Sequence, residues 1–406
     1  MIDEKPEAVG MDGERLARIP RFFQRYVDER KLAGVVTMVS RSGTVVHSEA
    51  IGSADLEAGA PMATDTIFRI YSMTKPVTSV ALMTLHEEGH LQLDDPVSRF
   101  IPAFADLRVW SDGTPLQYVT THPEREMTIR DLLTHTSGLT YGFMGRHPVD
   151  ALYRRRGIGG LDKVGTLATM VEGLAELPLL FSPGSRWSYS VATDVCGHLV
   201  EVISGQTLDR FLAERIFEPL RMVDTGFSVR DGSLDRFSAC YQKGKDGTAQ
   251  LVDAPTTSSY REAPSFLSGG GGLVSTAGDY HRFATMLLRK GELDGARILG
   301  RKTVELMTSN HLPGGGDLTS MGQAVFSETS YAGIGFGLGF SVMLDPATAQ
   351  VTGTAGEYAW GGAASTMFWV DPEEELIAIM LTQLLPSGCW PIRREMRSLT
   401  YQALVD

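Results

Sequence analysis

The sequence predicts an α+β protein in which an antiparallel sheet flanked by helices is built from both ends of the chain, with a mainly helical lobe inserted between them. Three observations support this. The chain begins with a helical pattern followed by two strand patterns, its last part returns to strands and a final helix, and its middle is richer in helical patterns and loops. The expected lobes are 1–89 with 256–406, and 90–255, with the functional site at their interface.

The first elements follow from hydrophobic spacing. Apolar residues at helical intervals predict a helix over 13–30. Two apolar runs over 35–40 and 44–50, separated by a turn at 41–43, predict a hairpin that packs on this helix. The residues that carry the helical pattern are Leu16, Ile19, Phe22, Phe23 and Tyr26.

The remaining elements are predicted in the same way. Gly89 marks the end of a helix that begins at Ser72. Two strands around Asp371-Pro372-Glu373 are expected to form a hairpin, and the Gly/Ser-rich stretch 312–330 is expected to be a loop. Helices are predicted over 72–88, 127–134, 164–177, 193–204, 208–217, 276–288 and 391–403, and strands over 335–344, 364–370 and 376–382.

The composition excludes several functional classes. The chain has 406 residues and a formal net charge of −12 without a long acidic run, which disfavours nucleic acid and anionic membranes as partners. Three scattered cysteines give neither a disulfide framework nor a metal site, so no metal or cofactor is expected. The N-terminus lacks the features of a secretory signal, and no apolar run could span a bilayer, so we expect a cytoplasmic location.

The most informative motif is Ser72-Met73-Thr74-Lys75, which is the only Ser-x-x-Lys in the chain. A serine and a lysine three residues apart at the start of a helix lie on one face, within reach of each other. This pairing can make a weak hydroxyl nucleophilic without a histidine, which predicts a covalent serine mechanism of acyl transfer.

A second motif supplies a candidate base. Tyr189 lies in Phe181 to Val191, on a turn just before the helix predicted to start at Thr193. A buried tyrosine beside a lysine ammonium is expected to have a lowered pKa, so that its phenolate could accept a proton. A core tyrosine with a satisfied hydroxyl is the alternative interpretation.

These two motifs together resemble the serine β-lactamase and penicillin-recognising superfamily. The resemblance covers nearly the whole chain and is greatest for the class C-like branch, including the family VIII carboxylesterases, and it implies a β-lactamase-like fold. Further matching segments are Leu93 to Val97, Leu132 to Leu139, Met222 to Phe227, Gly270 to Thr276 and Phe368 to Pro372.

The resemblance also implies roles for individual residues. Ser72 would be the acyl-accepting nucleophile, Lys75 would hold or take its proton, and Tyr189 would be the base in acylation and the acid for the leaving group. The amides of Ser72 and Ala363 would form the oxyanion hole.

The pocket departs from the β-lactamase pattern in two places. Tyr189-Ser190-Val191 replaces Tyr-x-Asn, and Trp360-Gly361-Gly362 replaces Lys-Thr-Gly, which removes a cation that would pair with a substrate carboxylate. Both changes favour neutral esters, and Trp-Gly-Gly is what family VIII esterases show. Tyr141 and Phe143 are expected to line the pocket with Trp360, Gly361 and Gly362.

The sequence therefore predicts a carboxylesterase that cleaves short-chain esters and needs no partner beyond its small-molecule substrate. Two alternatives stay open: a β-lactamase or acyltransferase on the same fold, and a non-catalytic ligand-binding or sensor module. The sequence leaves the oligomeric state and the physiological substrate undetermined.

Overall fold

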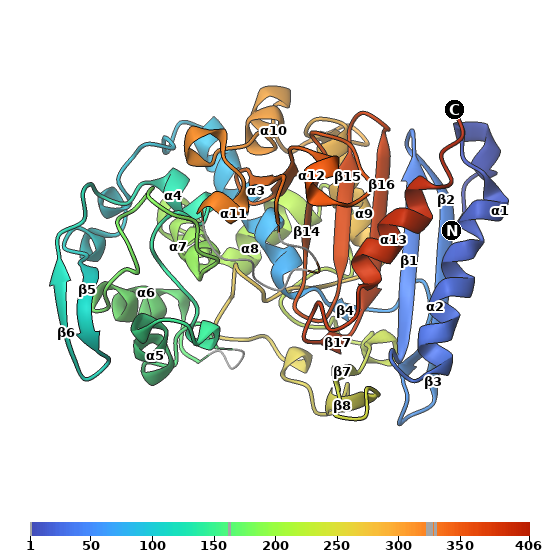
Figure 1. Ribbon diagram of the computed structural model, residues 1–406, viewed down its shortest axis with the longest axis horizontal. Coiled ribbons are helices and arrows are strands. Elements are labelled where there is room, and N and C mark those ends of the chain that lie inside the picture. The colour runs from blue at the N-terminus through green and yellow to red at the C-terminus, as the bar shows by residue number, and fades with distance from the viewer. Residues whose placement is uncertain (1, 161–163, 322–327, 329–330) are drawn as a thin grey trace.

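The computed structural model describes residues 2–160, 164–321, 328 and 331–406, and its central element is an eight-stranded sheet (Figure 1). The strand order is β12-β13-β14-β15-β16-β1-β2-β3, and every neighbouring pair is antiparallel. The predicted α+β class is confirmed. The strands are β1 (Gly34–Arg41), β2 (Thr44–Asp55), β3 (Ala60–Pro61), β12 (Ile334–Phe336), β13 (Ser341–Met343), β14 (Tyr358–Gly361), β15 (Met367–Asp371) and β16 (Leu376–Thr382).

Both ends of the chain meet at β1, the strand that joins the N-terminal part of the sheet to the C-terminal part. β1 pairs with β2 on one side and with β16 on the other, where Val35 lies opposite Thr382. Its side chains alternate between two cores, because successive residues of a strand point to opposite faces. Val35 and Val39 pack on one face, whereas Val36 and Met38 pack on the other.

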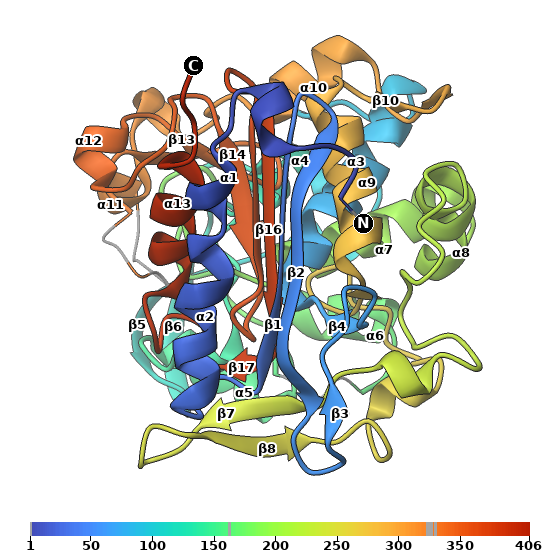
Figure 2. The same cartoon turned by 90° about the vertical axis from the view of Figure 1, so that its right-hand side faces the viewer.

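Helices cover both faces of this sheet (Figure 2). α1 (Gly13–Leu16), α2 (Arg18–Asp28) and α13 (Ile392–Tyr401) lie on one face, and α9 (Ala277–Leu288) packs against β1, β15 and β16. The helix predicted over 13–30 forms as two helices, α1 and α2, which meet at Ala17. Within the described residues, no helix combines the length and apolar character needed to cross a bilayer.

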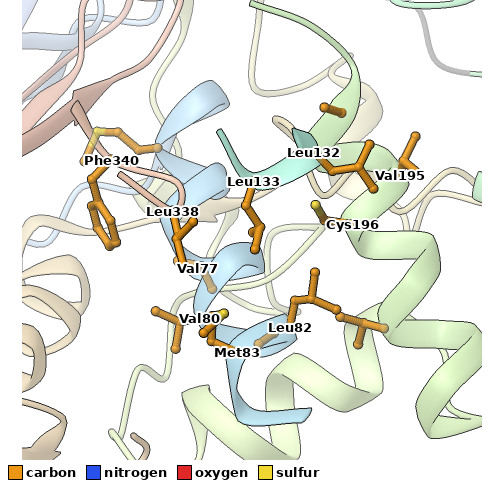
Figure 3. Packing of buried hydrophobic residues seen from close by; sticks show 14 of the residues in the cluster. Val77, Val80, Leu82, Met83, Leu132, Leu133, Val195, Cys196, Leu338 and Phe340 are labelled. Carbon is orange, nitrogen blue, oxygen red and sulfur yellow. The ribbon is translucent and has the colours of Figure 1, made fainter. Parts of the chain in front are cut away.

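The helix α3 (Thr74–Glu87) joins the sheet to the helical region, and its residues from Thr74 to Leu85 are all buried. Its apolar side chains contact α4 and α7 on one side and the segment after β12 on another (Figure 3). A helix buried all round has little freedom to move, which suits it to carry reactive groups. The helical region contains α4 (Ile129–Leu133), α5 (Pro148–Arg155), α6 (Leu167–Ala175), α7 (Ala192–Ser204) and α8 (Leu208–Leu212), the last continued by a π-helical turn, Ala213–Phe217.

Some elements differ from the sequence prediction. The single strand expected over 335–344 is the hairpin β12–β13, because Gly337 and Gly339 form a turn there and Gly339 has a φ of +98°. The predicted loop 312–330 contains a 3-10 turn and α11 (Leu318–Met321), and its positions 322–327, 329 and 330 fall outside the described residues. The lobe boundaries at 89/90 and 255/256 stay a prediction.

The hairpins that were not expected from the sequence include two longer ones. β5 (Val109–Thr114) pairs with β6 (Gln117–Thr121) at the left edge of Figure 1, and β7 (Cys240–Lys243) pairs with β8 (Ala249–Asp253). The remaining short elements are β4 (Phe68–Arg69), β9 (Val274–Ser275), β10 (Glu292–Leu293), β11 (Ala296–Arg297), β17 (Leu384–Leu385), α10 (Arg301–Met307) and α12 (Pro346–Ala349).

Candidate active site

Ser72 and Lys75 lie side by side at the start of α3. A 3-10 turn, Tyr71–Met73, leads into the helix, and Lys75 Nζ lies 3.2 Å from Ser72 Oγ. Tyr71, immediately before the serine, has a φ of +44°, a left-handed conformation that is strained for a tyrosine. Such strain is found where a structure holds a reactive group in place.

Tyr189 reaches the same serine from the helical region. Its hydroxyl donates a hydrogen bond of 2.6 Å to Ser72 Oγ. The segment that carries it is fixed before α7 begins, because the Ser188 amide donates to the carbonyl of His135. The His135 ring also lies 5.0 Å from the Tyr189 ring, so this histidine packs against the tyrosine.

Lys75 is enclosed, and its amine has a complete set of partners. The side chain is 1% exposed, and Nζ donates to the Gly270 carbonyl at 2.7 Å and to the Tyr141 hydroxyl at 3.0 Å. Burial lowers the pKa of Lys75 to about 7, and the negative charge of Asp194 opposes this fall. A neutral amine has two N–H donors and one lone pair. The two donors match Gly270 and Tyr141, which leaves the lone pair for the Ser72 hydroxyl.

The expectation that Tyr189 has a lowered pKa is wrong. Burial raises the pKa of Tyr189 above its ordinary value, and its hydrogen bond with Ser72 opposes that rise only in part. The reason is that burial disfavours the charged phenolate more than its hydrogen bonds favour it. The Tyr189 phenol therefore keeps its proton near pH 7, whereas Lys75, with a pKa of about 7, changes its charge there.

Asp194 holds the Gly270 segment, whose carbonyl binds the Lys75 amine. Asp194 Oδ1 accepts hydrogen bonds from the Gly270 amide at 3.0 Å and from the Ser268 hydroxyl at 2.5 Å, and the Gly270 carbonyl in turn accepts from Lys75. Asp194 was not singled out by the sequence analysis. The available signal was an aspartate in the first turn of a helix that opens just after Tyr189.

The segment after β14 carries the second expected oxyanion donor. Trp360 and Gly361 end β14 itself, and the expected strand at 364 begins at Met367. The Gly362 amide donates to Thr366, and a Cβ at Gly362 would lie 2.4 Å from the Ile70 carbonyl oxygen. Only glycine allows this approach, which brings the segment against the turn that carries Ser72.

The residues expected to line the pocket do so. The site opens into a cavity of about 1030 Å³ that is lined by Ser72, Tyr141, Phe143, Trp360, Gly361, Gly362 and Ala363, among others. The Trp360 ring lies 5.6 Å from the Tyr189 ring, and Phe143 stacks on Tyr141 at 4.7 Å.

Arg393 of α13 was missed by the sequence analysis. Its guanidinium donates to the carbonyls of Gly362 at 2.7 Å and Thr366 at 2.9 Å, which fixes the segment between β14 and β15.

Within the part of the chain that the structure describes, no group of three or more His, Cys, Asp or Glu side chains is arranged to hold a metal ion.

Known proteins are similar to this chain over most of its length. The sequence model of the family described as Beta-lactamase matches residues 19–399. Protein Rv1367c of Mycobacterium tuberculosis is 40% identical over 88% of this chain and 88% of its own length, and Esterase EstB of Burkholderia gladioli is 33% identical over 98% of each chain. Among solved structures, EstCE1, a hydrolase with promiscuous acyltransferase activity, has a TM-score of 0.80 and 29% identity, and the match covers 96% of this chain and 99% of that one.

Proposed function

The chain belongs to the Beta-lactamase family, and within the serine hydrolases of that fold we propose that it is a carboxylesterase that cleaves short-chain esters through an acyl-enzyme on Ser72. The observation that carries the proposal is the double contact at one oxygen: Ser72 Oγ lies 3.2 Å from Lys75 Nζ and 2.6 Å from the Tyr189 hydroxyl. A proton acceptor and a proton donor thus face the same nucleophile.

From the two contacts at Ser72 Oγ we infer the following acylation step. Neutral Lys75 accepts the hydroxyl proton as Ser72 Oγ attacks the carbonyl carbon of the ester, and the amides of Ser72 and Ala363 stabilise the oxyanion. As the bond from carbon to the alcohol oxygen breaks, Tyr189 donates its proton to that oxygen and recovers one from the Lys75 ammonium. Attack by water then releases the acid and restores Ser72.

Trp360 in the wall of the site supports a neutral substrate. Trp360 stands where the resembling β-lactamases carry a lysine, and its ring packs on Tyr189 and Phe336. A substrate carboxylate would find no lysine there to pair with. We further propose that the protein acts in the cytoplasm on a small molecule, without a nucleic-acid or membrane partner.

Acyl transfer is the second candidate function, and the likeness to EstCE1, which is described as a hydrolase with promiscuous acyltransferase activity, favours it. Water and an alcohol would compete for the same acyl-enzyme. The two outcomes are separated by supplying p-nitrophenyl butyrate with an alcohol acceptor and measuring the ratio of new ester to free butyrate.

A fluorophosphonate probe, read by intact mass, tests the nucleophile. One adduct is expected on the wild-type protein and on a Ser204→Ala control, whose serine lies at the far end of α7, and none on Ser72→Ala. An undiminished adduct on Ser72→Ala would overturn the assignment, and no adduct on the wild type would favour a binding module. Strong nitrocefin turnover with negligible p-nitrophenyl butyrate turnover would instead identify a β-lactamase.

A further inference from the structure

Gly173 occupies the interior of α6, Leu167–Ala175, and faces the active-site cavity. Glycine weakens a helix relative to alanine or leucine, so a glycine inside a helix needs a reason in packing or function. Its φ is not positive, so its backbone is that of an ordinary helical residue. Backbone conformation therefore does not require glycine at this position.

Close packing does not require it either. Among the described residues, the one atom within 4 Å of a Cβ built at Gly173 is Ile158 Cδ1, at 3.1 Å, which is the end of a flexible side chain. The contrast is Gly197 on α7, where a Cβ would lie 2.9 Å from Leu208 and 3.5 Å from the Cα of Gly269. Gly197 lets elements approach each other, whereas Gly173 leaves space that belongs to the cavity.

That space has an apolar, glycine-rich wall. We call it the glycine chamber and define it by Gly157, Ile158, Gly159, Gly160, Met170 and Gly173, all of which line the cavity. The charged neighbour Arg156 also lines the cavity but forms an ion pair with Glu176. An apolar group that enters the chamber would displace water from Ile158 and Met170, which favours binding.

The size of the cavity indicates what fills the chamber. A volume of about 1030 Å³ lies just above the range of roughly 300–1,000 Å³ that is typical of pockets for drug-sized ligands. A short acyl group on Ser72 fills a small part of such a volume. Resting on the proposed function, we infer that the substrate is a short-chain ester of a bulky apolar alcohol, and that the alcohol lies in the glycine chamber, which Gly173 keeps open.

The test compares three esters: p-nitrophenyl acetate, p-nitrophenyl decanoate, and 9-anthracenylmethyl acetate, whose bulk is all in the alcohol. Gly173→Leu should lower kcat/KM for the anthracenylmethyl ester, relative to p-nitrophenyl acetate, by about 10- to 200-fold, chiefly through KM. Adding Ile158→Ala should restore part of this ratio, because it removes the side chain that the new leucine would meet.

Gly278→Leu is the matched control, since Gly278 lies in the first turn of α9, is exposed, and has Thr276 Oγ1 at 3.9 Å from its Cβ position. It should leave all three esters unchanged. Leucine favours a helix more than glycine, so Gly173→Leu is expected to fold, which a circular dichroism melt verifies.

The outcomes separate this inference from the proposed function. If Gly173→Leu reduces all three esters equally, the chamber does not hold the alcohol. If the selective loss falls on the decanoate, the chamber holds the acyl group and the assignment is overturned. If wild-type protein hydrolyses none of the esters and takes no fluorophosphonate, the proposed esterase function fails, and this inference with it.

Discussion

Asp194→Asn should shift the pH dependence of catalysis without dismantling the site. The asparagine keeps an oxygen that can accept from the Gly270 amide and the Ser268 hydroxyl, and it removes only the negative charge. Burial sets the pKa of Lys75 at about 7, so kcat/KM of the wild type should rise with pH through about 7 as the amine becomes neutral. At one pH unit below the pKa, about one tenth of the protein has neutral Lys75.

The size of the shift follows from the charge that is removed. Gly270 separates the Lys75 amine from the Asp194 carboxylate and forms a hydrogen bond with each of them. Over the distance of about 6–8 Å that this path spans, two unit charges interact by about 2–3 kcal/mol at an effective dielectric constant of about 20. This corresponds to about 1.5–2 pH units. Because the carboxylate favours the ammonium, its loss lowers the pKa of Lys75, and the acidic limb of the profile should move to lower pH.

The other titratable groups that face Lys75 do not produce this shift. Burial raises the pKa of Tyr141 and of Tyr189, and it lowers that of His135, so all three are neutral around pH 7.

The assay is kcat/KM for p-nitrophenyl butyrate between pH 5 and 9. Asp150→Asn is the control, since Asp150 is also a buried carboxylate, 2% exposed, but it accepts from Thr140 and caps α5, whereas the charge that acts on Lys75 is that of Asp194. A limb that stays in place in Asp194→Asn, or that moves to higher pH, refutes the electrostatic role of Asp194.

Two further changes probe stability and the oxyanion site. Lys75→Met should abolish turnover and raise the melting temperature. The pKa of Lys75 is about 7 in the folded protein and 10.5 ordinarily, so the free energy of unfolding of the wild type rises with pH between these values. The stability gained by Lys75→Met, a few kcal/mol at most, should therefore be largest below pH 7 and shrink toward pH 10.5. Equal calorimetric differences at pH 6.5 and 9.5 would contradict this. Gly362→Ala should lower kcat by about 100- to 1,000-fold, because the new Cβ would meet the Ile70 carbonyl at 2.4 Å and displace the Ala363 amide. Burst kinetics with p-nitrophenyl butyrate measure this effect. A kcat equal to that of the wild type would show that the segment adapts to the alanine.

The sequence predicts best what depends on short spacing. Ser72 and Lys75 sit on one helical turn, and their contact follows from the helix geometry alone. The β15–β16 hairpin also follows from local pattern, with two buried strands around a turn. The β5–β6 hairpin was missed because most of its side chains are exposed and polar, so it shows no apolar alternation.

Residues that act through tertiary contacts are harder to find. Arg393 reaches the Gly362 carbonyl from a helix at the other end of the β14–β16 region, and no spacing rule connects the two. The pKa of Tyr189 was predicted in the wrong direction because the prediction gave the charge of Lys75 more weight than the cost of burying a phenolate. The burial of Tyr189 decides the direction, and that burial exists only in the folded protein.

The strand order has a consequence for synthesis on the ribosome. The β1–β2 hairpin is complete once Asp55 is made, but β1 cannot complete its pairing until β16, ending at Thr382, has emerged. At about 5–20 residues per second, the roughly 330 residues between these two points take about 16–65 s. During that time the β1–β2 hairpin presents an unpaired, apolar edge of the kind that aggregates or recruits chaperones. During that time the nascent chain also lacks Gly362 and Ala363, so the cavity around Ser72 is still without this part of its wall.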